Sequence, residues 1–169
     1  KDAYLAGGTA CALQLGHRIS VDLDFFTEKE SPVEFILKQL EQLPEFKLDE
    51  TTKWTILGSF QKVKFSHFYY PYPLIKKVSI FSQTNIASLE DIAAMKIDAI
   101  CSRGTKRDFI DLYFLAKKFS LNKILQFYDK KYSKLSNNIY HILKSFNYFA
   151  DADPQPSPKM LIPVSWEEV

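Results

Sequence analysis

Two aspartates near the N-terminus of the 169-residue chain have the type and spacing of metal ligands. Asp22 and Asp24 alternate with apolar residues, so on an extended strand both carboxylates point to one face while Leu23 and its apolar neighbours point to the other. Hard divalent cations such as Mg²⁺ or Mn²⁺ take carboxylate oxygens as ligands and keep phosphate oxygens in their remaining positions. A surface turn built by Asp side chains is the alternative, but the alternation favours a strand and a metal site.

A glycine pair lies shortly before these aspartates, in the segment Gly7-Gly8-Thr9. Glycines allow the backbone to approach a phosphate closely, and Thr9 offers a hydroxyl and an N–H group where a helix begins. The two motifs together predict a site for a phosphate-bearing substrate and its metal.

A second group of charged residues lies in apolar helical segments. Lys96 has apolar neighbours one turn away on both sides, so its ammonium group must either extend to the surface or face an anion. Asp108 and Asp111 lie one turn apart on an apolar stripe and therefore also need partners. Two interpretations stay open: an active-site role, or a structural ion-pair network with Arg103 or Arg107.

The surrounding pattern predicts the elements that position these residues. Strands are expected at 3–6, 21–26 and 74–82, and helices at 9–15, 32–43, 89–102, 106–118, 121–131 and 137–149. Two β-rich stretches, 46–57 and 60–70, form a predicted hairpin that turns at Gly58-Ser59. Ser31 and Ser88 are predicted helix caps, the latter with Asp91 three residues on. The fold class is therefore α+β, a mixed-sheet core followed by a helical C-terminal part and a proline-rich irregular tail.

Composition indicates one globular core. Hydrophobic residues make up 46% and charged residues 25% of the chain, and no apolar run approaches the ~20 residues of a membrane-spanning helix. We therefore expect no membrane partner and a cytoplasmic location. Cys11 and Cys101 lack a metal-ligand spacing and are expected to be reduced. Because the chain starts at Lys1, we expect the native protein to have further N-terminal residues, and a targeting signal stays open.

Charge is unevenly distributed along the chain. Residues 117–144 contain seven lysines and a single acid, Asp129, together with several aromatic residues. Such a segment could follow a phosphate backbone and stack on bases. The alternative is a solvated lysine face on amphipathic helices whose aromatic residues belong to the core.

Three ordered motifs resemble the AbiEii-type abortive-infection toxins of the nucleotidyltransferase superfamily. They are the segments 5–10, 16–26 and 96–115, which contain Leu-Ala-Gly-Gly-Thr-Ala, Val-Asp-Leu-Asp-Phe-Phe and Arg-Asp-Phe-Ile-Asp-Leu. The resemblance implies a nucleotidyltransferase-like core at 1–87, a helical part at 88–150 and a tail at 151–169. It also implies transfer of a nucleotide from a nucleoside triphosphate to RNA, best the 3′ end of tRNA, or to a protein, and an antitoxin partner.

The resemblance also implies roles for individual residues. The nucleotide would be bound by Gly7, Gly8, Thr9, Lys96, Arg103 and Asp108. The metal would be held by Asp22 and Asp24, which with Lys96 and Asp111 form the expected catalytic set. By this account Lys96 offsets charge on the leaving pyrophosphate, and the acceptor hydroxyl is activated through Asp24 or directly by Asp111.

One departure from the family pattern leaves other functions open. Nucleotidyltransferases commonly add a third acid on a later strand, but this chain has no Asp or Glu between Thr51 and Leu89. Ser66 or His67 stands where that acid is expected. A non-catalytic module of the same fold that binds nucleic acid or a protein is therefore one alternative. A glycosyltransferase with a metal-binding Asp-x-Asp is another, although such an enzyme needs a larger nucleotide-binding domain.

Overall fold

A seven-stranded mixed sheet forms one half of the molecule. The computed structural model describes residues 2–169, and only the backbone at 135 and 136. The strands are β1 (Tyr4–Leu5), β2 (Leu23–Thr27), β3 (Phe46–Thr51), β4 (Thr55–Phe60), β5 (Val63–Tyr69), β6 (Ser79–Phe81) and β7 (Thr84–Ile86), in the spatial order β3-β4-β5-β2-β1-β7-β6. Strand β2 pairs in parallel with β5 and antiparallel with β1, so it is central. It contains Asp24, while Asp22 lies just before its first residue, although the sequence predicts a strand over 21–26.

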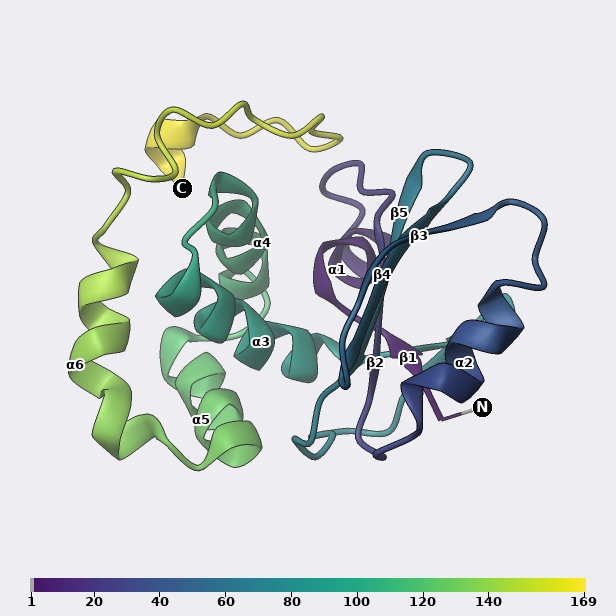
Figure 1. Cartoon of the computed structure of the whole chain (residues 1–169). Helices are drawn as coiled ribbons and strands as arrows, with labels where there is room; N and C mark the ends of the chain where they lie inside the picture. The colour runs from purple at the N-terminus through teal and green to yellow at the C-terminus, as the bar shows by residue number, and fades with distance from the viewer. Residues whose placement is uncertain (1) are drawn as a thin grey trace.

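Helices cover the sheet unequally. They are α1 (Gly7–Leu15), α2 (Val33–Leu40), α3 (Leu89–Ser102), α4 (Lys106–Ala116), α5 (Leu121–Tyr132), α6 (Leu135–Phe146) and the short 3-10 helix η1 (Trp166–Glu168). Helix α1 and the group α3 to α6 lie on one side of the sheet, and α2 lies on the other (Figure 1). The predicted α+β class with a helical C-terminal part is confirmed.

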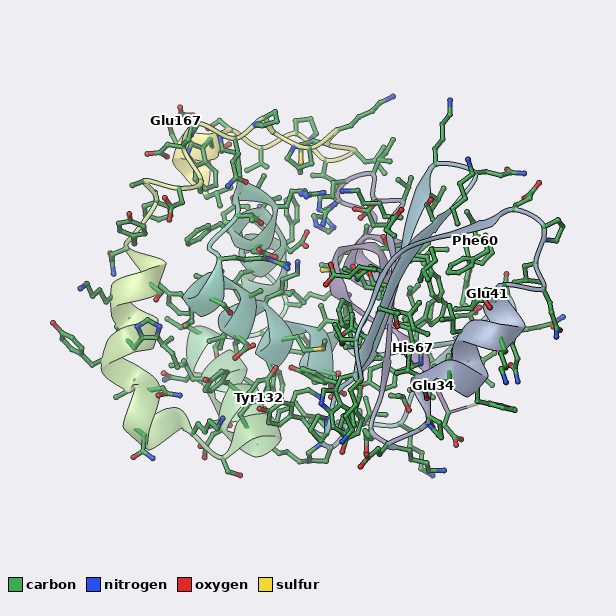
Figure 2. All side chains as sticks on the ribbon, viewed as in Figure 1. Glu34, Glu41, Phe60, His67, Tyr132 and Glu167 are labelled. Carbon is green, nitrogen blue, oxygen red and sulfur yellow. The ribbon has the colours of Figure 1, made fainter. Side chains whose placement is uncertain are left out.

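Register between β2 and β5 decides which side chains face the helical group. Asp24 is paired with Ser66, and Phe25 with His67. Because side chains alternate along a strand, Ser66 shares the face of Asp24, whereas His67 is buried on the α2 side (Figure 2). Of the two residues considered for the position of the third acid, Ser66 is the one on the correct face.

The hairpin predicted at Gly58-Ser59 is wrong, because both residues lie inside β4. The turns instead lie at 52–54 and at Gln61-Lys62, where φ is positive at both residues. A Cβ at position 58 would lie 2.5 Å from the Lys47 carbonyl oxygen and 2.7 Å from the Phe46 ring. Gly58 is therefore required by the close approach of β3.

Several predicted element boundaries also differ from the structure. The strand expected at 74–82 is reduced to β6, because the N–H groups of Ile75 and Lys76 donate to the Asp91 carboxylate, at 2.8 and 3.2 Å, instead of to a neighbouring strand. Helix α2 begins after Pro32 without a side-chain cap, so the cap predicted at Ser31 is wrong. The Ser88 cap of α3 is confirmed, since its hydroxyl accepts from the Asp91 N–H group.

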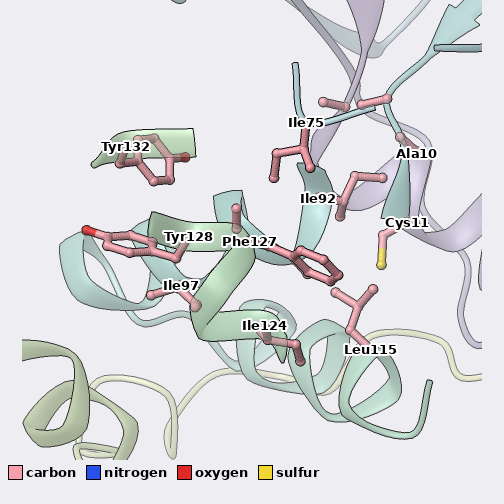
Figure 3. Close-up of a cluster of buried hydrophobic side chains, with 14 of the residues drawn as sticks. Ala10, Cys11, Ile75, Ile92, Ile97, Leu115, Ile124, Phe127, Tyr128 and Tyr132 are labelled. Atoms are coloured by element: carbon pink, nitrogen blue, oxygen red, sulfur yellow. The ribbon is translucent and has the colours of Figure 1, made fainter. Parts of the chain in front are cut away.

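The main core joins the sheet to the helices. Ile92 and Ile97 of α3 are fully buried and belong to one cluster with Cys11 of α1 and with Ile124 and Phe127 of α5 (Figure 3). This cluster contains residues from both halves of the chain. The division at residue 87 therefore stays a prediction about the chain rather than a visible break in the packing.

The basic segment contributes to this core more than its composition indicates. Tyr128 and Tyr132 are buried, and Lys131 donates to the Asp91 carboxylate at 2.9 Å and to the Pro73 carbonyl at 3.1 Å. Neither these aromatic rings nor Lys131 can serve as a nucleic-acid surface. The interpretation that the aromatic residues belong to the core is the correct one here.

Within the described part of the chain, the proline-rich tail contains no helix or strand between α6 and η1, and it crosses the molecule to the loop before β2 (Figure 1). The Ile19 N–H group donates to the Lys159 carbonyl, and the Leu161 N–H group donates to the His17 carbonyl, both at 2.8 Å. The tail is therefore held beside the segment that leads to the paired aspartates. Among residues 2–169, none of the helices is long and apolar enough to span a membrane.

Candidate active site

One cavity brings the N-terminal motifs and the helical charges together. It has a volume of about 270 Å³ and lies between β2, the start of α1 and the facing ends of α3 and α4. Its lining residues are Gly8, Arg18, Ser20, Asp22, Asp24, Lys96, Arg103, Thr105, Arg107 and Asp108. Segments separated by more than seventy positions in the chain thus meet at one polar cavity.

The paired aspartates form the acidic side of this cavity. Burial raises the pKa of Asp24, and the negative charge of Asp22 raises it further, while a hydrogen bond from Ser66 acts in the opposite direction. No ion pair joins Asp24 to a cation within the described part of the chain. Two like-charged carboxylates and a hydroxyl on one face of the sheet are a donor set that fits a hard divalent cation.

The start of α1 approaches these acids closely. Gly7 has a φ of +67°, and a Cβ there would lie 3.1 Å from an Asp24 carboxylate oxygen. The Thr9 hydroxyl donates to the Asp22 carbonyl and lies 3.0 Å from the Ser20 hydroxyl oxygen, so it positions the strand instead of facing the cavity. What this segment can offer a phosphate is therefore the main-chain N–H groups at the helix start.

Lys96 is buried between two carboxylates of α4. Its ammonium nitrogen lies 2.9 Å from Asp108 Oδ1 and 2.6 Å from Asp111 Oδ2. Burial alone would lower the pKa of Lys96, but Asp111 and Asp108 hold it above its ordinary value. The anions that Lys96 faces are the protein's own carboxylates, so Lys96 joins the ion-pair network that the sequence analysis considered for Asp108 and Asp111 with an arginine.

Asp111 is enclosed by positive and hydrogen-bonding groups. Besides Lys96, it accepts from Arg18 Nε at 2.7 Å and lies 2.8 Å from His17 Nε2. Burial alone would raise the pKa of Asp111, but Lys96, Arg18 and His17 hold it well below its ordinary range. A fully buried carboxylate of low pKa does not reach the cavity and is a weak proton acceptor.

His17 and Arg18 are the residues that the sequence analysis missed. Their partner is separated from Arg18 by 93 positions, so no local spacing signals the contact. The only sequence signal is their place in the segment 16–26, which carries the family resemblance. Arg18 also lines the cavity, although only 3% of its surface is exposed and its guanidinium group already donates to Asp111 and to the Ile19 carbonyl.

The two arginines at the α3–α4 corner have different partners. Arg103 donates from Nε to Asp108 Oδ2 at 2.9 Å, as one predicted pairing required. Arg107 does not pair with either acid of α4; its Nη1 lies 3.8 Å from Asp22 Oδ2, and its side chain is 56% exposed. Arg107 is therefore a cation that can move toward an anionic ligand at modest cost.

A second group of potential metal ligands is buried behind the cavity. Ligand atoms of Cys11, His17 and Asp111 lie within 4.8 Å of one another. Burial raises the pKa of the Cys11 thiol, which lies among apolar side chains (Figure 3), and two cations already neutralise Asp111. A further cation is not favoured there, so we assign this group to packing.

Comparison with known proteins agrees with this geometry. The family model described as "Nucleotidyl transferase AbiEii toxin, Type IV TA system" matches residues 1–158. The uncharacterized protein aq_aa25 of Aquifex aeolicus (strain VF5) is 39% identical over 174 residues, covering 99% of this chain and 82% of that protein.

Solved structures share the fold at low sequence identity. JHP933 from Helicobacter pylori is 21% identical, covering 93% of this chain and 77% of that chain with a TM-score of 0.52. The nucleotidyltransferase toxin MenT4 (Rv2826c) of Mycobacterium tuberculosis H37Rv is 16% identical, covering 81% of this chain and 58% of that chain with a TM-score of 0.55. At these identities the likeness supports the fold.

Proposed function

Because the chain belongs to the AbiEii family of nucleotidyltransferase toxins of type IV toxin–antitoxin systems, we propose that it transfers a nucleotidyl group in the cavity beside β2. The observation that carries this proposal is the convergence of two acids, a helix start and three arginines on one cavity of about 270 Å³. Acids suit a divalent cation, and arginines with main-chain N–H groups suit a triphosphate.

The acidic side of the cavity has one role in this proposal. Asp22 and Asp24 would hold Mg²⁺ or Mn²⁺, with the Ser66 hydroxyl beside Asp24. When bound, the cation would neutralise phosphate charge and favour the ionised form of an attacking hydroxyl. Thr9 supports Asp22 through its main-chain carbonyl, so it is a positioning residue.

The basic side of the cavity would bind the triphosphate. Gly8 lines it at the start of α1, where main-chain N–H groups would bind phosphate oxygens, and Arg103 and Arg107 line it at the α3–α4 corner. The acceptor hydroxyl forms the new bond to the α-phosphorus, and pyrophosphate leaves. Asp108 holds Arg103 in place and Asp111 holds Arg18, while Lys96 lies between these two carboxylates.

The acceptor, the partner and the location belong to the same proposal. An RNA acceptor, the 3′ end of tRNA first, fits the exposed lysines of α5 and its flanks, such as Lys130 and Lys134. A protein acceptor is the second choice. The family supports an antitoxin partner, and we propose the cytoplasm as the place of action.

One observation favours a second candidate function. Ser66 replaces the third acid, as a non-catalytic module that binds nucleic acid or a protein would allow. An assay for chemistry separates the two candidates, because a binding module releases no pyrophosphate.

The test is transfer of label from each α-labelled nucleoside triphosphate in the presence of Mg²⁺, with total tRNA, total protein or no acceptor. Asp22→Ala and Asp24→Ala should each reduce transfer by roughly 10²-fold or more. Asp49→Ala, at an exposed position of β3, is the matched control and should leave transfer unchanged. Activity retained in either cavity variant, with an unchanged fold by circular dichroism, would contradict the assignment.

A further inference from the structure

A second cavity opens directly beside the first one and has a different lining. It also has a volume of about 270 Å³, and it shares Asp24, Lys96 and Arg103 with the cavity described above. Away from this shared border most of its lining is aromatic or apolar, namely Phe26, Phe68, Tyr70, Ile92, Met95 and Ala99, with Gly7, Asp98 and Ser102 as the exceptions. We refer to it as the aromatic cavity.

Its sheet wall consists of rings on the same face as the paired aspartates. Phe26 lies two residues after Asp24 on β2, and Phe68 is its register partner on β5. The ring centroids of Phe26 and Phe68 are 5.2 Å apart, and Tyr70 lies at 5.2 Å from Phe26 in an edge-on arrangement. All three rings are only partly buried, because α3 does not close over them.

The opposite wall carries one carboxylate that the fold does not use. Asp98 lies on α3, and its side chain makes no hydrogen bond or ion pair among residues 2–169. Partial burial raises the pKa of Asp98, and the positive charge of Lys134 acts in the opposite direction. Asp98 is exposed at the rim of this cavity, so its carboxylate is accessible to a ligand.

We propose that the aromatic cavity binds the nucleobase of the nucleoside triphosphate, and that Asp98 selects bases that carry an exocyclic amino group. This inference rests on the proposed function. A nucleotide is the ligand class that combines a polyanionic triphosphate, which suits the arginines of the first cavity, with a planar base, which suits the rings of the aromatic cavity. Partly exposed aromatic rings stack on any of the four bases and do not distinguish between them.

Selection among bases would then come from Asp98. An ionised carboxylate only accepts hydrogen bonds, so it pairs with the amino groups of adenine, guanine or cytosine. Uracil offers a carbonyl oxygen in place of an amino group, which the carboxylate repels. We therefore expect binding of uridine triphosphate to be weaker by roughly tenfold or more.

The test measures binding by calorimetry in Mg²⁺ without acceptor. The probes are the four nucleoside triphosphates and inorganic tripolyphosphate, which has no base. Phe68→Ala should weaken binding of the preferred nucleotide by roughly tenfold and leave binding of tripolyphosphate unchanged. Phe68→Leu retains most of the packing but not the aromatic ring, so it should have the same effect on binding. Asp98→Asn should narrow or reverse the discrimination against uridine triphosphate, because its amide can donate to the uracil oxygen.

Controls and outcomes keep the two proposals separate. Phe81→Ala on β6 and Asp49→Asn on β3 change exposed residues of the same types elsewhere and should alter nothing. If the wild-type chain binds neither the nucleotides nor tripolyphosphate, the proposed function fails. If it binds them and the Phe68 variants have no selective effect, or if uridine triphosphate binds as well as the others, the inference is overturned while the proposed function stands.

Discussion

Replacing Lys96 by Met tests whether the buried charges of α3 and α4 form one energetic unit. Methionine retains the apolar stem of the side chain and removes the ammonium group. Asp108 and Asp111, only 1% and 0% exposed, then each lose a cation within 2.9 Å. We expect the variant to be less stable than the wild type, although methionine suits an apolar helix.

The magnitude follows from the partners that remain. Removing one member of a buried ion pair costs about 3–5 kcal/mol. Arg103 still pairs with Asp108, and Arg18 still pairs with Asp111, so we expect the lower end, about 3 kcal/mol. At a typical urea m-value of about 2 kcal/mol/M, the unfolding midpoint should fall by about 1.5 M.

Urea unfolding followed by far-ultraviolet circular dichroism measures this change in the free energy of unfolding. Lys130→Met, on the exposed face of α5, is the matched control and should change stability by less than about 0.5 kcal/mol. Adding Asp108→Asn to Lys96→Met should recover part of the loss, because it removes a buried negative charge that has lost one of its two cations. If Lys96→Met is as stable as the control, the buried network does not have the energetic role that its geometry indicates.

Other expected outcomes address the remaining contacts. The pKa of Asp111 is held below its ordinary 3.8, so its ionised carboxylate stabilises the folded state above that pH, and this stabilisation is lost as the pH falls toward the folded-state pKa. The free energy of unfolding, measured against pH, should therefore fall less steeply below about pH 4 in Asp111→Asn than in the wild type. Lys131→Met should destabilise the chain by about 3 kcal/mol in urea unfolding, because it leaves a buried carboxylate unpaired. The double variant Lys130→Gln with Lys134→Gln should keep its stability yet flatten the salt dependence of tRNA use; an unchanged salt slope would favour a protein acceptor. Gly58→Ala should lower the thermal midpoint by an amount equivalent to a loss of about 1–3 kcal/mol in the free energy of unfolding, because β3 leaves no space for a Cβ at this position. If Gly58 lay in a turn, the same substitution would have been tolerated.

The sequence by itself determined the local features of this protein. Alternation around Asp22 and Asp24 predicted a strand, which the structure has from Leu23 onward with both aspartates lining one cavity, and Ser88 predicted the start of α3. These predictions succeed because strand alternation and helix capping depend on residues within a few positions of one another. The family motifs were visible for the same reason, since each is a short continuous segment.

Only the tertiary structure decided which of these segments meet. Lys96 lies 2.6 Å from Asp111, and Arg18 completes the cavity through a contact across 93 positions. Gly58 is required by a neighbouring strand, and Lys131 by a buried acid. The sequence shows that a charge or a glycine is present, but the partner that gives it a role is brought close by packing between distant segments, where one apolar stripe can be covered in several ways.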